Sequence, residues 1–383
     1  MLISKKTDRF IIATFVALLP FISMANPVDS VHVSTEAVDK VVETKHAQTT
    51  EELDPAKEKV AEFIQHHLQD SHDFIFFSDE AEAKEYGFSL PVILYDNGLK
   101  LFSSSKLEHG KAIAEVDGSF YKLVHGKIYK TDAKGTITED EKTGYPKNDQ
   151  PLDFSVTKNV VSMLFVSALM LFLFIGLARS YKKGPIPTGA GRVLEPLIIF
   201  IREEIAIPNI GETKYRKFMG YLLTVFFFIW ILNILGLTPL GINVTGNISI
   251  TVCLALFTYV ITQFSANKDY WKHIFWMPDV PVLMKIFLIP IELLGTLTKP
   301  FALLIRLFAN ITAGHVVVMS LIAMIFVSKN LYMDVPISLG LTLFLSVIEI
   351  LIAFLQAFIF TMLTSLFIGM AVQEHEHGSE HAH

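Results

Sequence analysis

The chain has 383 residues, of which 51% are hydrophobic, and its mean hydropathy of +0.46 excludes an ordinary soluble protein. Residues 26–157 hold 25 Asp and Glu against 14 Lys and no Arg, a net charge of −11, so the rest of the chain contributes +5 to the total of −6. The acidic part argues against a nucleic-acid partner, and the basic, apolar part predicts membrane spans joined by cationic cytoplasmic loops.

Residues 1–25 have the pattern of a secretory signal peptide. Lys5, Lys6 and Arg9 form a cationic start, residues 10–22 are apolar, and small residues precede the expected cleavage after Ala25. Cleavage would place the mature N-terminus outside the cytoplasm, in a bacterial periplasm. The alternative is an uncleaved signal-anchor helix, and N-terminal sequencing of the purified protein distinguishes the two.

Residues 26–155 predict an acidic linker and a small β-rich periplasmic domain without catalytic chemistry. The linker leads into a short helix at about residues 60–68, where apolar residues recur at helical spacing. From Phe74 onward, short apolar runs are separated by turn dipeptides such as Asn97-Gly98, which favour hairpins. No metal is expected at His66, His67, His72, His109 or His125, because these histidines do not have the spacing of a structural zinc site.

Five membrane spans are predicted after residue 155, because five apolar segments are long enough to cross a hydrocarbon core of about 30 Å. Basic loops alternate with the uncharged loop 236–247, which places the C-terminus and its His-rich tail, residues 375–383, in the cytoplasm. A short turn with Lys329 and Asp334 then lies outside. The last two segments exceed the length of an upright span and are expected to be long and tilted. The spans are expected at about 156–178, 218–235, 248–264, 291–327 and 337–372.

Between the first two spans, the sequence predicts a helix on the cytoplasmic membrane surface. Its apolar residues follow one helical stripe, and Arg202, Glu203 and Glu204 lie off that stripe. Prolines at 185, 187 and 208 bracket the segment. The apolar stripe of this helix consists of Val193, Leu194, Leu197, Ile198, Ile201 and Ile205.

The fold class is therefore an all-α polytopic membrane protein with five transmembrane helices, one surface helix and a small β-rich N-terminal domain.

Arg306 is a single guanidinium inside the apolar run from Phe301 to Val327. A charge at the centre of a bilayer costs about 3 kcal/mol or more, so it normally faces a bundle interior or an aqueous cavity that supports it. No carboxylate of this chain is clearly its partner. The sequence therefore indicates that Arg306 is the functional centre and that its anion lies on another subunit.

Four further polar residues accompany Arg306 on the last two predicted helices. Asn310 follows one turn later and His315 nine residues later, while Glu349 and Gln356 lie about 20° apart on the final helix. In an antiparallel hairpin with Arg306 level with Gln356, the imidazole and the carboxylate lie at similar depth on the outer side, as a proton entry route requires. The nine-residue spacing turns the imidazole about 180° away from the arginine, and a simple hairpin does not reconcile this.

Other readings of these polar groups remain open. Interhelical hydrogen bonds are common in membranes, and for Asn310 or Gln356 alone a structural role is equally acceptable. Glu292 and Lys299, nearer the cytoplasmic end, either line an inner vestibule or are interfacial charges whose side chains reach water. No catalytic residue, metal or cofactor is expected.

Two segments resemble subunit a of F-type ATP synthases, the membrane stator: L-L-G-T-L-T-K-P-F-A-L-L-I-R-L-F-A-N-I-T-A-G-H at 293–315 and L-Q-A-F-I-F-T-M-L-T at 355–364. The resemblance covers about residues 150–374 and implies a membrane domain at 156–374. It implies a non-catalytic, proton-conducting subunit of the bacterial inner membrane, whose partners are a c-ring, a subunit b stalk and the remaining ATP synthase. In that family the arginine matching Arg306 is indispensable. It faces a membrane carboxylate on each c-ring subunit, which two offset half-channels reach from opposite sides.

The resemblance also implies roles for the neighbouring residues. It assigns proton translocation to Arg306, Asn310, His315, Glu349 and Gln356, with Glu292 in a possible inner half-channel. Family members with Glu at the position of His315 tend to have His at that of Glu349, and this chain has the reverse arrangement, seen in other members. The exchange preserves an acid and an imidazole at similar depth.

Two departures from the family pattern stand out. Ala309 occupies a position often held by glycine, and the acidic outer domain is not part of the minimal pattern. The choice between proton and sodium depends largely on the ring and stays open. The alternative function is a secondary transporter or proton channel without a rotor, although no internal repeat of the transporter kind is visible. A third reading, an outer sensor domain on a membrane anchor, leaves the charges at mid-membrane unexplained.

Overall fold

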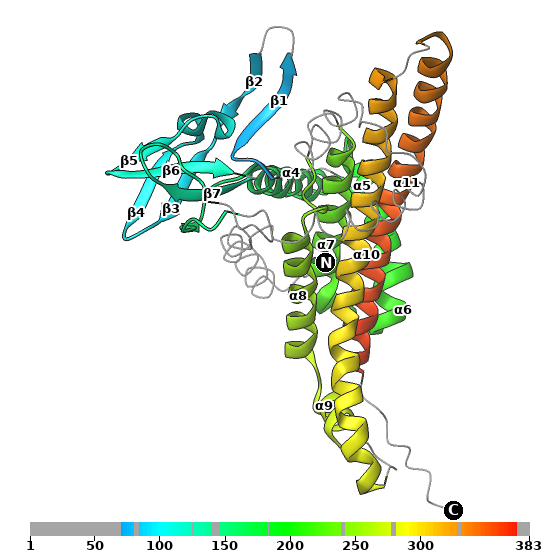
Figure 1. The fold of residues 1–383 in the computed structure, drawn as a ribbon. Helices are drawn as coiled ribbons and strands as arrows, with labels where there is room; N and C mark the ends of the chain where they lie inside the picture. The colour runs from blue at the N-terminus through cyan, green and yellow to red at the C-terminus, as the bar shows by residue number, and fades with distance from the viewer. Residues whose placement is uncertain are drawn as a thin grey trace, which may run out of the picture.

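A computed structural model describes residues 70–79, 84–124, 126–138, 146–182, 184–238, 242–276, 281–327 and 331–373. It consists of a helical bundle with a small β domain at one side (Figure 1). The predicted signal peptide, the short helix at 60–68 and the His-rich tail lie outside the described residues. So do His66, His67, His125 and Lys329.

The β-rich domain that the alternating runs predicted is present, and it contains three small antiparallel sheets. Asn97-Gly98 and Asp117-Gly118 form two of the turns, with φ of 51° at Asn97 and 49° at Asp117, a conformation that Asn, Asp and Gly tolerate best. A 3₁₀ helix at Ser104–Gly110 was not predicted. The strands pair as β1 (Asp73–Asp79) with β2 (Lys84–Ser89), β3 (Pro91–Tyr95) between β4 (Leu99–Ser103) and β8 (Leu152–Asp153), and β6 (Ser119–Val124) between β5 (Ala114–Val116) and β7 (Lys127–Thr131).

The base of the β domain is bound to the first membrane helix, α4 (Lys158–Ser180), by backbone and side-chain contacts. The amide of Lys158 donates to the carbonyl of Ser71 at 2.9 Å, and the amide of Asn159 donates to Oδ1 of Asp70 at 3.1 Å. Asp70 thus accepts a hydrogen bond from one of the free amides at the start of α4. Its carboxylate also lies at the positive end of the helix dipole, which is a favourable interaction. Phe74 belongs to the same hydrophobic core as the helices, so the domain is packed onto the bundle rather than tethered to it.

His72 crosses this base to reach Asp153, 81 residues later in the chain. Its side chain is 4% exposed, and Nε2 lies 3.1 Å from Oδ2 of Asp153. Burial opposes the charged imidazole, but the hydrogen bond and charge of Asp153, together with Asp70 and Asp73, raise the pKa of His72 above its ordinary value. Although burial opposes its charged form, the contacts with His72 lower the pKa of Asp153. The two groups therefore favour each other's charged forms.

Replacing His72 by leucine is expected to loosen the base of the β domain in a pH-dependent way. Because the folded-state pKa of His72 is raised, its stabilisation is fully present below the ordinary value of about 6.5 and is lost as the pH rises through the folded-state value. The variant should lose about 1–3 kcal/mol of local stability at pH 6 and less at pH 9. Hydrogen exchange of the β3 amides, corrected for intrinsic pH dependence, measures the loss. The β6–β7 amides serve as the internal control, and an equal loss at both pH values would contradict the assignment.

Five described helices are long and apolar enough to cross a membrane, as predicted. The last two differ from prediction at their starts: α10 begins nine residues before the predicted 291, and Asp334 lies inside α11 instead of in a turn. Pro290 and Pro300 lie within α10, because neighbouring helices and polar side chains can satisfy the backbone groups that a proline frees. The five candidate membrane-spanning helices are α4, α7 (Tyr215–Gly236), α8 (Ile248–Ser265), α10 (Val282–Val327) and α11 (Leu331–Val372).

The segment predicted as a surface helix is α5 (Gly191–Phe200), a π-helical turn at Ile201–Ala206, and α6 (Ile207–Ile210). The wider turn accommodates Pro208, which lacks the amide that would bond to residue 204. Leu194, Ile201 and Ile205 of the apolar stripe are buried and Leu197 and Ile198 are partly buried, whereas Val193 is 65% exposed. Much of the stripe therefore packs on protein, and its placement on the membrane surface stays a prediction.

A close contact between α6 and α11 depends on Gly369. A Cβ at this position would lie 2.0 Å from the carbonyl oxygen of Asn209. Gly369→Ala is therefore expected to push α6 from α11 and to destabilise the subunit by about 1–3 kcal/mol. Thermal denaturation of the purified complex measures the effect. Gly340→Ala on the same helix is the control, because a Cβ there meets nothing within 4 Å. Equal midpoints for the two variants would show that this contact contributes nothing.

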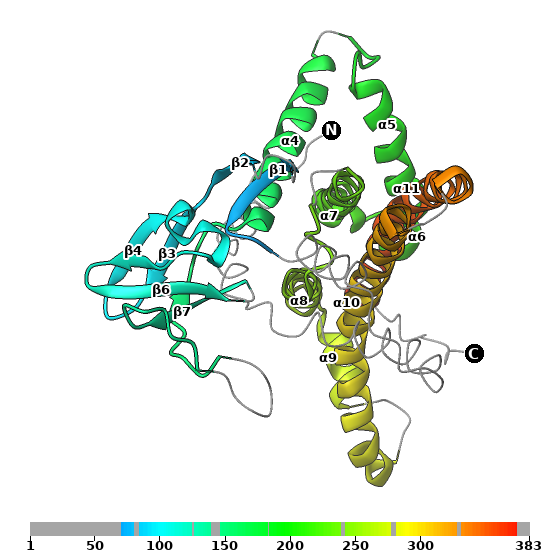
Figure 2. The same cartoon turned by 45° about the horizontal axis from the view of Figure 1, so that its top comes forward.

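The long helices α10 and α11 run side by side along the bundle, with α11 packed on α7 and α10 on α8 (Figures 1 and 2). Figure 2 looks nearly along the axes of α7 and α8, and α4 and α5 run across that view. A short helix, α9 (Lys268–Phe275), connects α8 to α10 and was not predicted. This arrangement leaves one side of the α10–α11 pair turned away from the other helices.

Candidate functional site

Arg306 lies on the side of α10 that the other described helices do not cover. Leu303 and Leu307 of the same turns are 1% and 0% exposed and face the bundle. Arg306 itself is exposed, and its neighbours Phe301 and Ile305 are 59% and 46% exposed. Among the residues that the structure describes, no carboxylate forms an ion pair with Arg306. One cation thus stands in an uncovered apolar surface.

Small side chains border Arg306 along this exposed side of α10. Thr298, Ala302, Ala309 and Ala313 are all exposed, and with Arg306 they follow one another at intervals of three or four residues. Such spacing places them on one helical face. Small residues on a membrane helix allow the backbone of another helix to approach closely. The surface around the guanidinium is therefore shaped for close contact with a further helix.

Glu349 approaches α10 at the residue before His315. A Cβ built on Gly314 would lie 2.6 Å from Oε1 of Glu349, so the half-buried carboxylate rests against the backbone of α10. Only a residue without a side chain leaves that space free. Glu349 of α11 therefore lies beside residues 314–315 of α10. The side chains of His315, Asn310 and Lys299 fall outside the described set.

Gln356 lies in a different environment from Arg306. Its side chain is 2% exposed, and Ala353, Ala357 and Phe360 on the same side of α11 are also buried. Glu349, two turns earlier on the predicted common face, is only half-buried. The amide is therefore turned toward the interior of the bundle, while the guanidinium faces outward.

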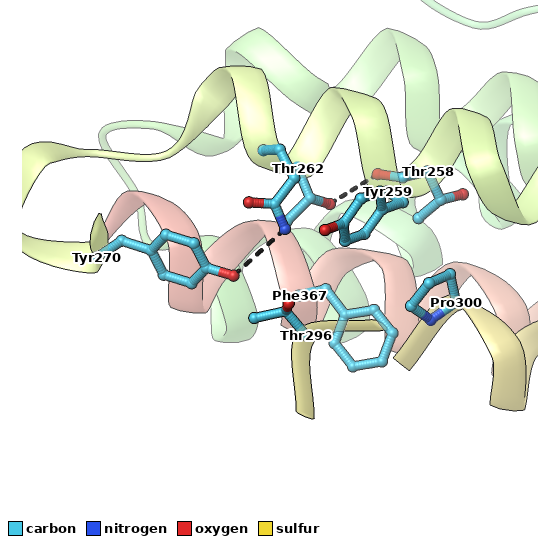
Figure 3. Close-up of a pocket in the computed structure, with 8 residues that line it drawn as sticks. Thr258, Tyr259, Thr262, Tyr270, Thr296, Pro300 and Phe367 are labelled. Carbon is cyan, nitrogen blue, oxygen red and sulfur yellow. Dashed lines mark hydrogen bonds between the residues drawn. The ribbon is translucent and has the colours of Figure 1, made fainter. Parts of the chain in front are cut away.

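A small pocket with several polar side chains in its lining lies between α8, α9, α10 and α11, on the N-terminal side of Arg306 along α10 (Figure 3). Nε2 of Gln263 donates to the hydroxyl of Tyr270 at 3.5 Å, and Oε1 of Gln263 is buried without a partner in the described part of the chain. The space has about the size of one water molecule. The lining residues are Thr258, Tyr259, Thr262, Gln263, Tyr270, Thr296, Pro300 and Phe367.

Glu292 lies near this pocket. Burial raises the pKa of Tyr270, and the charges of Tyr259 and Glu292 raise it further, which places the Glu292 carboxylate within electrostatic reach of the phenol.

Sequence reasoning missed Thr258 and Thr262 because each threonine can also bond to its own helix backbone, as Thr262 does to the carbonyl of Thr258 at 2.8 Å. Their spacing of four residues inside an apolar run was the available signal.

A second polar group, near the C-terminal end of α7, was also missed. Asn233 is 3% exposed near the end of α7, and its Oδ1 accepts from Oγ1 of Thr245 at 2.8 Å. Its Nδ2 is buried without a partner within the described ranges. A buried amide hydrogen that lacks a protein acceptor is a place where bound water stabilises the fold. Asn233 was passed over because it stands alone in an apolar run.

The chain matches two family models. Residues 160–369 match the family described as ATP synthase A chain, and residues 63–154 match a domain of unknown function. The first match covers all five candidate membrane spans apart from their ends. The second covers the β domain, so that domain is a recognised unit with no function attached to it.

Curated relatives agree with the first family. The chain is 45% identical over 240 residues to ATP synthase subunit a of Chloroherpeton thalassium, covering 60% of this chain and 71% of the relative. It is 46% identical over 243 residues to that of Pelodictyon phaeoclathratiforme, with the same coverage, and 43% identical over 241 residues to that of Anaeromyxobacter dehalogenans, covering 61% of each. These matches confirm the resemblance seen in the sequence. The chain belongs to the ATP synthase subunit a family, whose members are non-catalytic, multi-pass, proton-conducting stator subunits of the membrane sector.

Proposed function

We propose that Arg306 is the fixed positive charge that faces the membrane carboxylates of a rotating c-ring. The observation that carries this role is one guanidinium in an uncovered apolar surface, bordered by small side chains, without a carboxylate partner among the described residues. An arginine keeps its charge in a low-dielectric setting where a lysine can lose its proton. Its partner is therefore an anion brought by another subunit.

In this proposal protons enter from the outer side past His315 and Glu349. The position of the Glu349 carboxylate against Gly314 supports this route, because it brings an acid to the level of the imidazole. An imidazole with an ordinary pKa of about 6.5 exchanges protons reversibly near neutral pH. We also assign Asn310 and Gln356 to this path, as the family resemblance implies, with Gln356 acting from its buried position inside the bundle. Asn233, at the outer end of α7, lies where an aqueous entrance would open.

The proton then neutralises a ring carboxylate, which can turn into lipid without the cost of a buried charge. After nearly a full turn the carboxylate reaches an inner half-channel, where we place Glu292. The polar pocket near Glu292 supports an aqueous vestibule at the inner end. Arg306 then favours the ionised carboxylate by opposite charge and blocks a direct proton leak between the two half-channels.

We place the subunit in a bacterial inner membrane, with a cleaved signal peptide, the β domain in the periplasm and the C-terminus in the cytoplasm. The basic residues Arg179 and Lys182 at the inner end of α4 and the uncharged loop between α7 and α8 support this orientation. The proposed partners are the c-ring, the subunit b stalk and the remainder of the ATP synthase.

Purification of the intact complex followed by reconstitution into vesicles tests the proposal. A ring of small hairpin subunits should co-purify with the chain, and added ATP should acidify the vesicle lumen. Proton transport by the chain alone, with no ring present and no response to ATP, would favour a channel or secondary transporter. That result would overturn the rotor assignment for Arg306.

A further inference from the structure

The sheet formed by β4, β3 and β8 is apolar on both of its faces. Val92, Leu94 and Phe102 point into the core of the β domain and are 0%, 0% and 7% exposed. Alternate positions of the same strands also carry large apolar side chains, and these are exposed. We call them the outer apolar patch: Tyr95, 55% exposed, Leu99, 69%, Leu101, 63%, and Leu152, 54%.

Strand register makes these four side chains one continuous surface. Tyr95 of β3 pairs with Leu99 of β4 on one side and with Leu152 of β8 on the other. Leu101 of β4 pairs with Ile93, which lies two residues before Tyr95 on the same face of β3. Side chains directly opposite one another on antiparallel strands lie about 5 Å apart. The patch therefore crosses all three strands without a gap.

The charged residues of these strands are turned to other partners. Nζ of Lys100, between Leu99 and Leu101, is 2.8 Å from Oδ2 of Asp117. Asp96, next to Tyr95, lies 2.7 Å from Nζ of Lys130 and accepts from the Tyr121 hydroxyl at 3.1 Å. The patch itself consists of three leucines and a tyrosine and carries no charge.

The patch lies close to the point where the chain enters the membrane. Leu152 is six residues before Lys158, the first residue of α4, so the two are at most about 22 Å apart. Figure 2, viewed along α7 and α8, shows β3 and β4 beside the bundle and not over it. In Figure 1 the two strands lie on the opposite side of the domain from the β1–β2 hairpin.

We propose that the outer apolar patch rests in the headgroup region of the bilayer leaflet next to the start of α4, and so anchors the β domain to lipid. Tyrosine suits this depth because its ring is apolar and its hydroxyl stays in water. The composition favours lipid over a protein partner, because protein hot spots are enriched in Trp, Tyr and Arg and poor in Leu. With the contacts of Ser71 and Asp70 to the start of α4 at its base, the domain then has two points of attachment.

Site-directed spin labelling of the reconstituted complex tests this anchor. The chain has one cysteine, Cys253, so replacing it by serine leaves a background into which single cysteines can be placed. Leu101→Cys and Leu152→Cys report on the patch, and Glu115→Cys, on an exposed position of β5, is the matched control. The vesicles contain phosphatidylcholine and phosphatidylglycerol. Collision with oxygen, which concentrates in lipid, is compared with collision with a water-soluble nickel chelate.

At both patch positions, the ratio of oxygen to nickel accessibility is expected to be several-fold higher than at Glu115→Cys. In detergent-free nanodiscs too small for lipid to extend beneath the domain, the patch ratio should fall toward that of the control. High nickel accessibility at the patch in vesicles would overturn the proposal, because the patch would then lie in water. Low accessibility to both reagents would overturn it as well, because a protein partner or a second copy would then cover the patch. Neither outcome would affect the proton path proposed for Arg306.

Discussion

Arg306→Ala is expected to abolish ATP-driven proton pumping and ATP synthesis while the complex still assembles. The side chain of Arg306 is exposed on α10, so its removal is expected to leave the fold intact. Removing one partner of a charge pair in a low-dielectric setting costs about 3–5 kcal/mol. That cost corresponds to a loss of about 150- to 5,000-fold in any step that depends on the pair.

The measurement is acidification of vesicles that contain the purified complex, with added ATP. Arg202→Ala is the matched control, because Arg202 pairs with Glu203 on a surface segment, at 2.6 Å, and lies outside the proposed path. Arg306→Lys keeps a charge whose pKa can shift, so it should remain strongly impaired. Full ATP-driven pumping by Arg306→Ala would refute the assignment.

Exchanging His315 and Glu349 is expected to impair proton transport less than either residue's replacement by alanine. The exchange keeps one imidazole and one carboxyl at the same level of the membrane, and each single alanine removes one of them. Losing a positioned proton-transfer group reduces rates by about 100- to 10,000-fold. Because Glu349 lies directly against Gly314, the larger imidazole fits there only with some displacement, so the exchange should retain partial activity.

Proton flux through vesicles with an imposed pH gradient measures all three variants on one scale. Ser346→Ala on α11 is a suitable control, since its hydroxyl bonds to the carbonyl of Thr342 on its own helix. If the exchanged pair loses as much flux as the two alanine substitutions combined, the two groups do not act as a relay.

Much of the architecture could be read from the sequence, because a hydrocarbon solvent leaves few choices. Long apolar segments must be helical in lipid, so five spans were predictable within a few residues at most ends. The exceptions were the starts of α10 and α11, which lie at Val282 and Leu331 instead of the predicted 291 and 337. Turn dipeptides such as Asn97-Gly98 likewise specified hairpins, because few other residues adopt positive φ.

Contacts between distant segments could not be read in this way. His72 and Asp153 are 81 residues apart, and nothing in either local pattern links them. Gln263 and Tyr270 are only seven residues apart, but they meet across the break between α8 and α9, and the short helix α9 has no apolar run long enough to predict. The exposure of Arg306 and the burial of Gln356 likewise depend on which sides of α10 and α11 face the bundle.

The central claim is that Arg306 faces a carboxylate on a second protein, and cysteine cross-linking at its flanks tests this most directly. In a Cys253→Ser background, Ala302→Cys and Ala309→Cys lie on the exposed face beside Arg306, whereas Ala353→Cys lies on a buried position of α11. Each is paired with a cysteine one turn from the membrane carboxylate of a ring subunit. We expect disulfides from positions 302 and 309 and none from position 353. Cross-linking from position 353 alone, or none from the two flanking positions in an assembled complex, would contradict the two-protein site.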